Sequence, residues 1–189
     1  MEETVLEQKN NVSYLNAVTT FFKRGTCSEA CFSVLNRACA TPLPKEEHAT
    51  TPLAGGIIQH GYQCGLVWGA ALAAGTRALQ LYGTGTEARN SALAASQHIV
   101  DLFSSAFRDV NCQKITGIDW HKPGQIAGYF LRGGPARCFH MAGKFAPLAL
   151  AEIDSVFSTP AENSQAQPLS CSSLLIKKCG GSDRHAVMA

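Results

Sequence analysis

The sequence contains little charge and no dense run of either sign. Charged residues make up 16% of the 189 residues, and 16 basic against 14 acidic side chains leave a formal net charge of +2. Proteins that bind nucleic acid or an anionic membrane usually carry a basic patch or stripe, which this chain lacks. We therefore expect neither nucleic acid nor a membrane as partner, which leaves small molecules, metals and other proteins.

The chain also lacks a hydrophobic run long enough to span a bilayer. Its longest apolar stretch, residues 64–75, is shorter than the roughly 20 residues of a transmembrane helix, and Arg77 follows closely. The N-terminal residues MEETVLEQKNN are acidic and polar, whereas a secretory signal needs a basic start and an apolar core. These features predict a cytoplasmic protein.

Most short motifs of catalysis and cofactor binding are missing as well. The sequence has no Walker loop, no HExxH zinc motif and no CxxCH motif for covalent haem. Residues 83–88, GTGTEA, match a loose dinucleotide-binding pattern, but the pattern requires a preceding strand and the residues before it have helical spacing. We interpret them as a turn with a capped helix start.

Apolar residues recur at helical spacing in five stretches, and no stretch alternates as a strand would. A hydrophobic content of 46% over 189 residues is enough for one domain with a real core. We predict an all-α bundle of about five helices, with an irregular loop rich in glycine and aromatic residues before the last one. The expected helices span residues 4–22, 26–39, 61–82, 86–107 and 135–157, the loop spans 113–135, and a short helical turn is expected at 45–49.

The chain divides into three predicted segments. Residues 1–157 form the helical cysteine-containing domain, residues 158–170 (STPAENSQAQPLS) have the composition of a linker, and residues 171–189 resume helical character. The last segment resembles the start of the domain, with Cys171 in the place of Cys27, so one interpretation is the start of a truncated second repeat. The alternative is a terminal helix that docks on the domain or on another subunit.

Eight cysteines are the main compositional anomaly. In a reducing cytoplasm structural disulfides are rare, so several cysteines indicate metal binding or redox chemistry more often than covalent cross-links. The chain has no Cys-x-x-Cys pair, but four of its cysteines lie at predicted helix ends, and helix N-termini favour the thiolate. These helix-end cysteines are Cys27, Cys64, Cys112 and Cys138.

An ordered series of short motifs runs through the domain: CSEA at 27–30, GG at 55–56, CGLVWGAALAAG at 64–75, FSSAFRDVNCQKITG at 103–117 and RCFHMAGKFA at 137–146. Over residues 14–157 this order resembles the C-GCAxxG-C-C family of bacterial and archaeal redox-active proteins. The resemblance assigns the family's cysteines to the four helix-end cysteines and implies a redox-active or metal-binding protein. Leu66 and Trp68 depart from the family, which has smaller residues there, so Trp68 is expected to narrow the site.

Four thiolates suit three kinds of site. They can hold an iron–sulfur cluster or a tetrahedral zinc ion, or a pair such as Cys27 and Cys64 can cycle between dithiol and disulfide. We favour the iron–sulfur cluster, in electron transfer or redox sensing, because an apolar bundle can enclose one, whereas a thiol oxidoreductase usually needs an exposed thiolate. The alternatives are that oxidoreductase, a zinc- or cysteine-stabilised structural or interaction module, and four core cysteines without a ligand. The redox partner protein stays unidentified.

Other residues near these cysteines support weaker hypotheses. Cys31 lies one helical turn after Cys27, and both Cys31 and Cys39 are expected in the core. His60 is a candidate ligand or proton donor, with a solvated loop position as the alternative, and His140 is expected to point away from the cysteine two residues before it.

Two regions are candidates for contacts with other molecules. The small residues at 69–75 would allow a helix of a second subunit to approach closely, so a homodimer is one hypothesis. In the loop before the last helix, ordinary packing is the alternative to a role as lid or partner contact for Trp120, His121, Tyr129 and Arg132.

Overall fold

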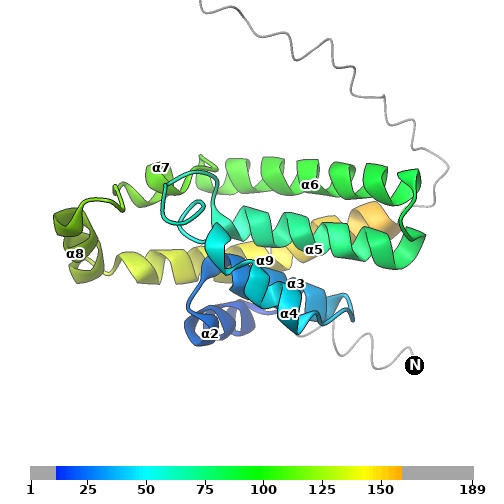
Figure 1. The fold of residues 1–189 in the computed structure, drawn as a ribbon, viewed down its shortest axis with the longest axis horizontal. Helices are drawn as coiled ribbons and strands as arrows, with labels where there is room; N and C mark the ends of the chain where they lie inside the picture. The colour runs from blue at the N-terminus through cyan, green and yellow to red at the C-terminus, as the bar shows by residue number, and fades with distance from the viewer. Residues whose placement is uncertain (1–11, 159–189) are drawn as a thin grey trace, which may run out of the picture.

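The computed structural model describes residues 12–158 (Figure 1). This part of the chain forms eight α-helices and no strand, which confirms the all-α prediction. Apart from Ser158, the predicted linker and terminal segment lie outside the described residues. The helices are α2 (Tyr14–Arg24), α3 (Cys27–Ala38), α4 (Pro44–Ala49), α5 (Gly65–Tyr82), α6 (Thr86–Phe107), α7 (Cys112–Thr116), α8 (Pro123–Leu131) and α9 (Gly134–Ser158), with a 3-10 turn, η1 (Thr51–Leu53), after α4.

Helix α5 lies at the centre of the bundle. It packs against α3, α6 and α9, while α2 packs on α3 and α9. Figure 1 shows α5 and α6 running side by side along the long axis, with α8 at the end where α9 begins. Fully buried side chains from four of these helices fill the core, among them Leu35, Val67, Ile99, Phe103 and Phe145.

Five long helices match the five predicted ones, but two begin later than expected. The expected helix 4–22 begins at Tyr14 within the described residues and ends at Arg24, because Ser13 has an extended backbone and its side chain caps the helix. The expected helix 61–82 begins at Gly65, because the residues before it are extended and pair with residues 110–112. Residues 4–11 lie outside the described part of the chain.

The three additional helices are short. The predicted turn at 45–49 is α4, and the predicted irregular loop contains α8 and most of α7. Proline occupies the first position of both α4 and α8, where its fixed φ suits a helix start. None of the helices between residues 12 and 158 has the length and apolar character that crossing a bilayer requires.

Helices α3 and α5 approach so closely that a glycine is required between them. A Cβ atom at Gly69 would lie 2.6 Å from the carbonyl oxygen of Ser28 and 2.9 Å from the amide nitrogen of Phe32. Both are backbone atoms of α3, so a side chain could be admitted only by moving the helix. Gly75, further along α5, has no heavy atom within 4 Å of the equivalent position.

We expect Gly69→Ala to lower the free energy of unfolding by about 1–3 kcal/mol, the usual cost of overpacking a closed interface. Gly75→Ala is the matched control on the same helix. It should be neutral or should stabilise the protein by up to about 1 kcal/mol, because alanine is the better helix former. Urea denaturation measures both. Equal effects of the two substitutions would contradict the close packing of α3 on α5.

Candidate functional site

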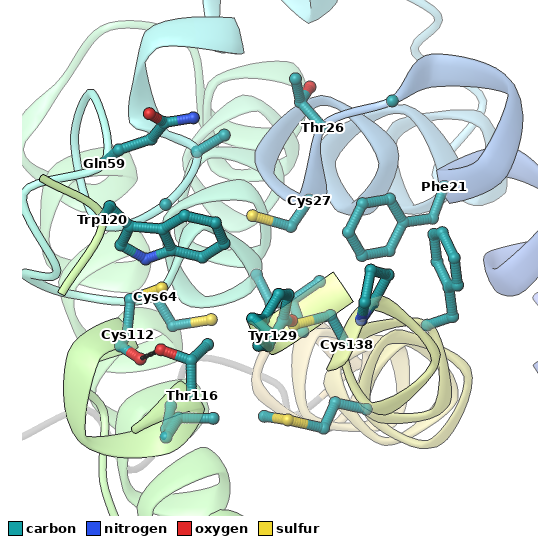
Figure 2. Close-up of a pocket in the computed structure, with 18 of the residues that line it drawn as sticks. Phe21, Thr26, Cys27, Gln59, Cys64, Cys112, Thr116, Trp120, Tyr129 and Cys138 are labelled. Atoms are coloured by element: carbon teal, nitrogen blue, oxygen red, sulfur yellow. Dashed lines mark hydrogen bonds between the residues drawn. The ribbon is translucent and has the colours of Figure 1, made fainter. Parts of the chain in front are cut away.

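The four helix-end cysteines line one cavity of about 330 Å³. Figure 2 shows their side chains around a common space, each from a different segment of the chain. Among the described residues, no charged side chain lines this cavity. The other lining residues are mainly apolar or aromatic: Phe21, Gly25, Thr26, Ala54, Gly55, Gln59, Leu66, Ile115, Thr116, Trp120, Tyr129, Phe130, Pro135, Phe139 and Met141.

Two backbone hydrogen bonds hold Cys64 and Cys112 on neighbouring segments. The amide of Cys64 donates to the carbonyl of Val110 at 2.7 Å, and the amide of Cys112 donates to the carbonyl of Tyr62 at 2.6 Å. These bonds flank an isolated antiparallel bridge between the two segments. Cys64 is the N-cap of α5 and Cys112 is the first residue of α7, so both thiols enter the cavity from fixed helix starts.

Cys27 is the first residue of α3 and lies directly against the start of α5. A Cβ atom at Gly65 would be 2.5 Å from the Sγ atom of Cys27 and 3.2 Å from the backbone of Ser28 and Leu53. Glycine at position 65 therefore allows the thiol of Cys27 to rest on the backbone of α5, one residue from Cys64.

A buried ion-pair cluster anchors the start of α3 from the outer side. The guanidinium of Arg24 donates to Glu29 at 3.0 Å and to Glu47 at 2.9 Å. Both carboxylates are buried, and the Thr51 hydroxyl donates to Glu29 at 3.2 Å. Because a guanidinium can bind two carboxylates in fixed geometry, this one residue joins α2, α3 and α4 beside Cys27.

Cys138 lies one turn into α9 and contacts the hydroxyl of Tyr129 from α8. The two atoms are 3.1 Å apart, and when the sulfur is a thiolate the hydroxyl is the donor. The ring of Trp120 packs edge-on against Tyr129, with ring centroids 5.4 Å apart. Helix α8 and the loop before it therefore provide the aromatic cover of the cavity.

A left-handed turn forms another part of the cavity wall. All residues from Gly55 to Gln59 have positive φ, including the β-branched Ile58 at 48°. Left-handed backbone costs an L-residue about 1–2 kcal/mol, so surrounding contacts must hold the turn. The amide of Ile58 donates to the carbonyl of Pro52 at 2.7 Å, and the amide of Gly61 donates to the carbonyl of Gly55 at 3.0 Å. Strained backbone of this kind concentrates at functional sites.

Burial raises the pKa of all four helix-end thiols, because their surroundings disfavour a charged thiolate. For Cys112 the pKa rises to about 12. At Cys27, Cys64 and Cys112, repulsion from the other thiolates of the set raises the pKa further. Hydrogen bonds from the Gly55 amide to Cys27 and from the Tyr129 hydroxyl to Cys138 oppose the rise only in part. The thiols are therefore neutral near pH 7 unless the cavity holds positive charge.

Two buried donors at the cavity have no hydrogen-bond acceptor. They are the hydroxyl of Thr26 and the indole N–H of Trp120. The Trp120 indole lies close enough to Cys112 to lower the pKa of its thiol, although by less than burial raises it. The geometry is not that of a complete hydrogen bond. A buried donor without an acceptor costs about 1–3 kcal/mol, so these two side chains carry an unfavourable contribution beside the cavity.

The four helix-end cysteines surround the cavity instead of meeting at one point. Between residues 12 and 158, no three His, Cys, Asp or Glu side chains are close enough to hold one metal ion. A single tetrahedral zinc ion needs sulfurs about 2.3 Å from the metal, so it would draw the thiols inward. A group of several atoms would not require the same contraction.

Several weaker expectations are confirmed. Cys31 and Cys39 are buried in the core and do not line the cavity. His60 lies in an exposed loop, as the solvated alternative predicts. His140 points away from the cavity, and its Nδ1 atom is 2.8 Å from the hydroxyl of Tyr14.

The expectation that Trp68 narrows the site is wrong. Leu66 lines the cavity and Trp68 does not, because residues two positions apart on a helix point to nearly opposite sides. The aromatic residues that do restrict the cavity are Trp120 and Tyr129, which the sequence indicated only as lid or partner contacts. The other two candidates of that loop, His121 and Arg132, are exposed outside the cavity.

A family model described as "Putative redox-active protein (C_GCAxxG_C_C)" matches residues 26–151, two-thirds of the chain. The matched region begins just before Cys27 and continues past Cys138, so it includes all four helix-end cysteines. No curated protein and no solved structure matches the chain.

We expect the metal-free, reduced protein to lose stability as the pH rises above about 8.5, the pKa of a cysteine in an unfolded chain. Because burial raises the thiol pKa values in the folded state, the unfolded chain releases its protons first and is favoured by alkali. The stability that the neutral thiols contribute is fully present at pH values below the thiol pKa of the unfolded chain. It is lost progressively as the pH rises towards the thiol pKa of the folded protein, which for Cys112 is about 12.

Urea denaturation at a series of pH values tests this expectation. Comparison with Cys112→Ser separates the thiol contribution from that of tyrosine and lysine, because the variant should lose less stability between neutral and alkaline pH. A wild-type protein whose unfolding free energy falls no more steeply than that of the variant would contradict the assignment.

Proposed function

The chain belongs to the C_GCAxxG_C_C family, described as one of redox-active proteins, and on this premise we propose that its four helix-end cysteines bind an iron–sulfur cluster. The function that follows is electron transfer or redox sensing. The observation that carries the proposal is the convergence of four thiols, from the starts of α3, α5 and α7 and from α9, on one cavity with an uncharged lining.

The donor set and the dimensions of the cavity suit such a cluster. Four cysteine thiolates are the usual ligands of two-iron and four-iron clusters. The thiols enclose a cavity of about 330 Å³. A cluster is larger than one metal ion, so its ligand sulfurs stand further apart, in keeping with thiols that do not meet at a point. The apolar lining also limits the access of solvent, one of the factors that set a cluster's potential.

The charge balance of the cavity supports the same proposal. Burial and mutual repulsion raise the pKa of the thiols, and bound iron would supply the positive charge that stabilises four thiolates. An attacking cysteine of a thiol oxidoreductase instead has a lowered pKa and an exposed sulfur. The raised pKa values therefore argue against a nucleophilic role of these thiols in the metal-free protein.

Donors of the chain would surround the ligand sulfurs. The Tyr129 hydroxyl is 3.1 Å from the sulfur of Cys138, and the Gly55 amide points to the sulfur of Cys27. A bound cluster would exchange single electrons, and hydrogen bonds to its sulfurs are among the features by which a protein sets the potential.

A dithiol/disulfide function is the second candidate, and one observation favours it. Cys64 and Cys112 lie on segments joined by two backbone hydrogen bonds, and both are free thiols. Exchange with a partner disulfide would join these two sulfurs and reduce the partner to two thiols. The buried position of both sulfurs is the argument against it.

Anaerobic purification followed by absorption spectroscopy and iron, sulfide and zinc analysis tests the proposal. We expect broad absorption at about 400 nm from sulfur-to-iron charge transfer, with matching iron and sulfide contents. Substitution of any one of the four helix-end cysteines by serine should cause the protein to lose most of its iron. Cys31→Ala and Cys39→Ala are matched controls, because both cysteines are buried outside the cavity, and they should retain it.

Two outcomes would reject the cluster. Protein with zinc in place of iron would support the structural module, and colourless metal-free protein with a Cys64–Cys112 disulfide would support thiol exchange. Equal iron loss from the cavity variants and from the two controls would indicate a general loss of folding, which circular dichroism of the same samples detects.

We expect Tyr129→Phe to lower the reduction potential of the bound cluster, because the substitution removes the hydroxyl that stabilises charge on the sulfur of Cys138. Tyr62→Phe is the control, since the Tyr62 side chain is exposed and does not line the cavity. Redox titration followed by electron paramagnetic resonance measures the shift. A potential that is the same in both variants and in wild type would contradict a role for the Tyr129 hydroxyl.

A further inference from the structure

Two histidines from distant parts of the chain meet beside the thiol cavity. The Nδ1 atom of His60 and the Nε2 atom of His121 are 3.3 Å apart, with ring centroids separated by 4.9 Å. Both side chains are exposed. Neither residue lines the cavity, so the pair is separate from the four helix-end cysteines.

We propose that His60 and His121 form a binding site for a divalent transition metal ion of the zinc type. Zinc–nitrogen bonds of about 2.0–2.1 Å at a tetrahedral angle place two ligand nitrogens about 3.3–3.4 Å apart. The observed separation of 3.3 Å agrees with this value. The two nitrogens are hydrogen-bonded to each other, so one of them carries a proton in the metal-free protein. Binding of a shared ion would move that proton to the other nitrogen of its ring and would require a small rotation of both rings.

Neighbouring residues contact the ring of His60 and the backbone of His121. The ring of Tyr62 stacks on His60 with centroids 5.6 Å apart and an interplanar angle of 13°. The backbone amide of His121 donates to the carboxylate of Asp119 at 3.0 Å, and Lys122 neutralises the same carboxylate at 3.4 Å. The stacked Tyr62 ring limits the rotation of the His60 side chain, and the Asp119 hydrogen bond fixes the backbone from which the His121 side chain extends.

The site has two protein ligands, and water completes the coordination. No third His, Cys, Asp or Glu side chain of residues 12–158 comes close enough to complete a set of three. Structural zinc sites are closed by four protein ligands, whereas sites with open positions bind exchangeable groups. Imidazole ligands suit zinc, copper and nickel, so the ion is a borderline metal that is captured and released.

An ion at this position would connect two parts of the cavity wall. His60 follows the left-handed turn and is the neighbour of Gln59, while His121 is the neighbour of Trp120. Figure 2 shows Gln59 and Trp120 on the same side of the cavity. The bound ion would therefore join the strained turn to the loop before α8 and restrain the opening of the cavity at that side.

Titration of the full-length protein with zinc chloride, followed by the ring-nitrogen NMR signals of histidine, tests the site directly. We expect the signals of His60 and His121 to shift together when zinc binds at this pair. The signals of His98 and His140, which are exposed on other faces, should not move. His60→Ala and His121→Ala should each weaken this binding by about tenfold or more, and His98→Ala should leave it unchanged.

The readout separates this site from the thiol cavity. Zinc retained by both His60→Ala and His121→Ala, with no shift of histidine signals in the wild type, would be bound by thiols and would overturn the proposal. Shifts of only one of the two rings, or equal shifts of all histidines, would do the same. Loss of iron binding in the cavity variants leaves these histidine signals in place, so the two proposals fail independently.

Discussion

The contact between the beginnings of α3 and α5 is the constraint on which the cavity depends. At Gly65 the sulfur of Cys27 occupies the space that a side chain would need, and at Gly69 the backbone of α3 does so. At Gly69 the contact is with backbone, so no side-chain movement can relieve it, whereas a Cβ atom at position 65 would displace the sulfur of Cys27 itself. The two glycines therefore set how far apart α3 and α5 lie, and with it the separation between the thiols of Cys27 and Cys64.

Two further sets of contacts turn this helix pair into a site. On the outer side, the buried carboxylates of Glu29 and Glu47 converge on Arg24, which fixes α2 and α4 against the start of α3. On the inner side, paired backbone hydrogen bonds hold Cys112 next to the segment that ends in Cys64. The cavity is thus built from helix starts whose positions are fixed by polar contacts, although its lining is mainly apolar.

The cavity is electrostatically incomplete with thiols alone. Between residues 12 and 158 no charged side chain lines the space that the four sulfurs share, and burial raises the pKa of each thiol, with Arg137 opposing the rise only at Cys138. A group that brings positive charge would stabilise the thiolates. The strained turn from Gly55 to Gln59 belongs to the same wall, and strain of this kind is tolerated where a fixed geometry serves function.

The sequence by itself determined the all-α class and the five long helices, because helical spacing is a local property of the chain. It indicated the four helix-end cysteines through their positions at predicted helix ends and through the order of motifs that resembles the C_GCAxxG_C_C family, but not that they line one cavity. It indicated Trp120 and Tyr129 only as loop residues, predicted wrongly that Trp68 narrows the cavity, and contained no signal for Phe21; the glycine pair at 55–56 indicated a turn but not its left-handed backbone through Gln59. Tertiary structure decided these points. The packing of α5, α8 and α9 decides that Leu66 faces the cavity and that the Tyr129 side chain contacts Cys138. Contacts between distant segments cannot be predicted from the spacing of residues within either segment alone.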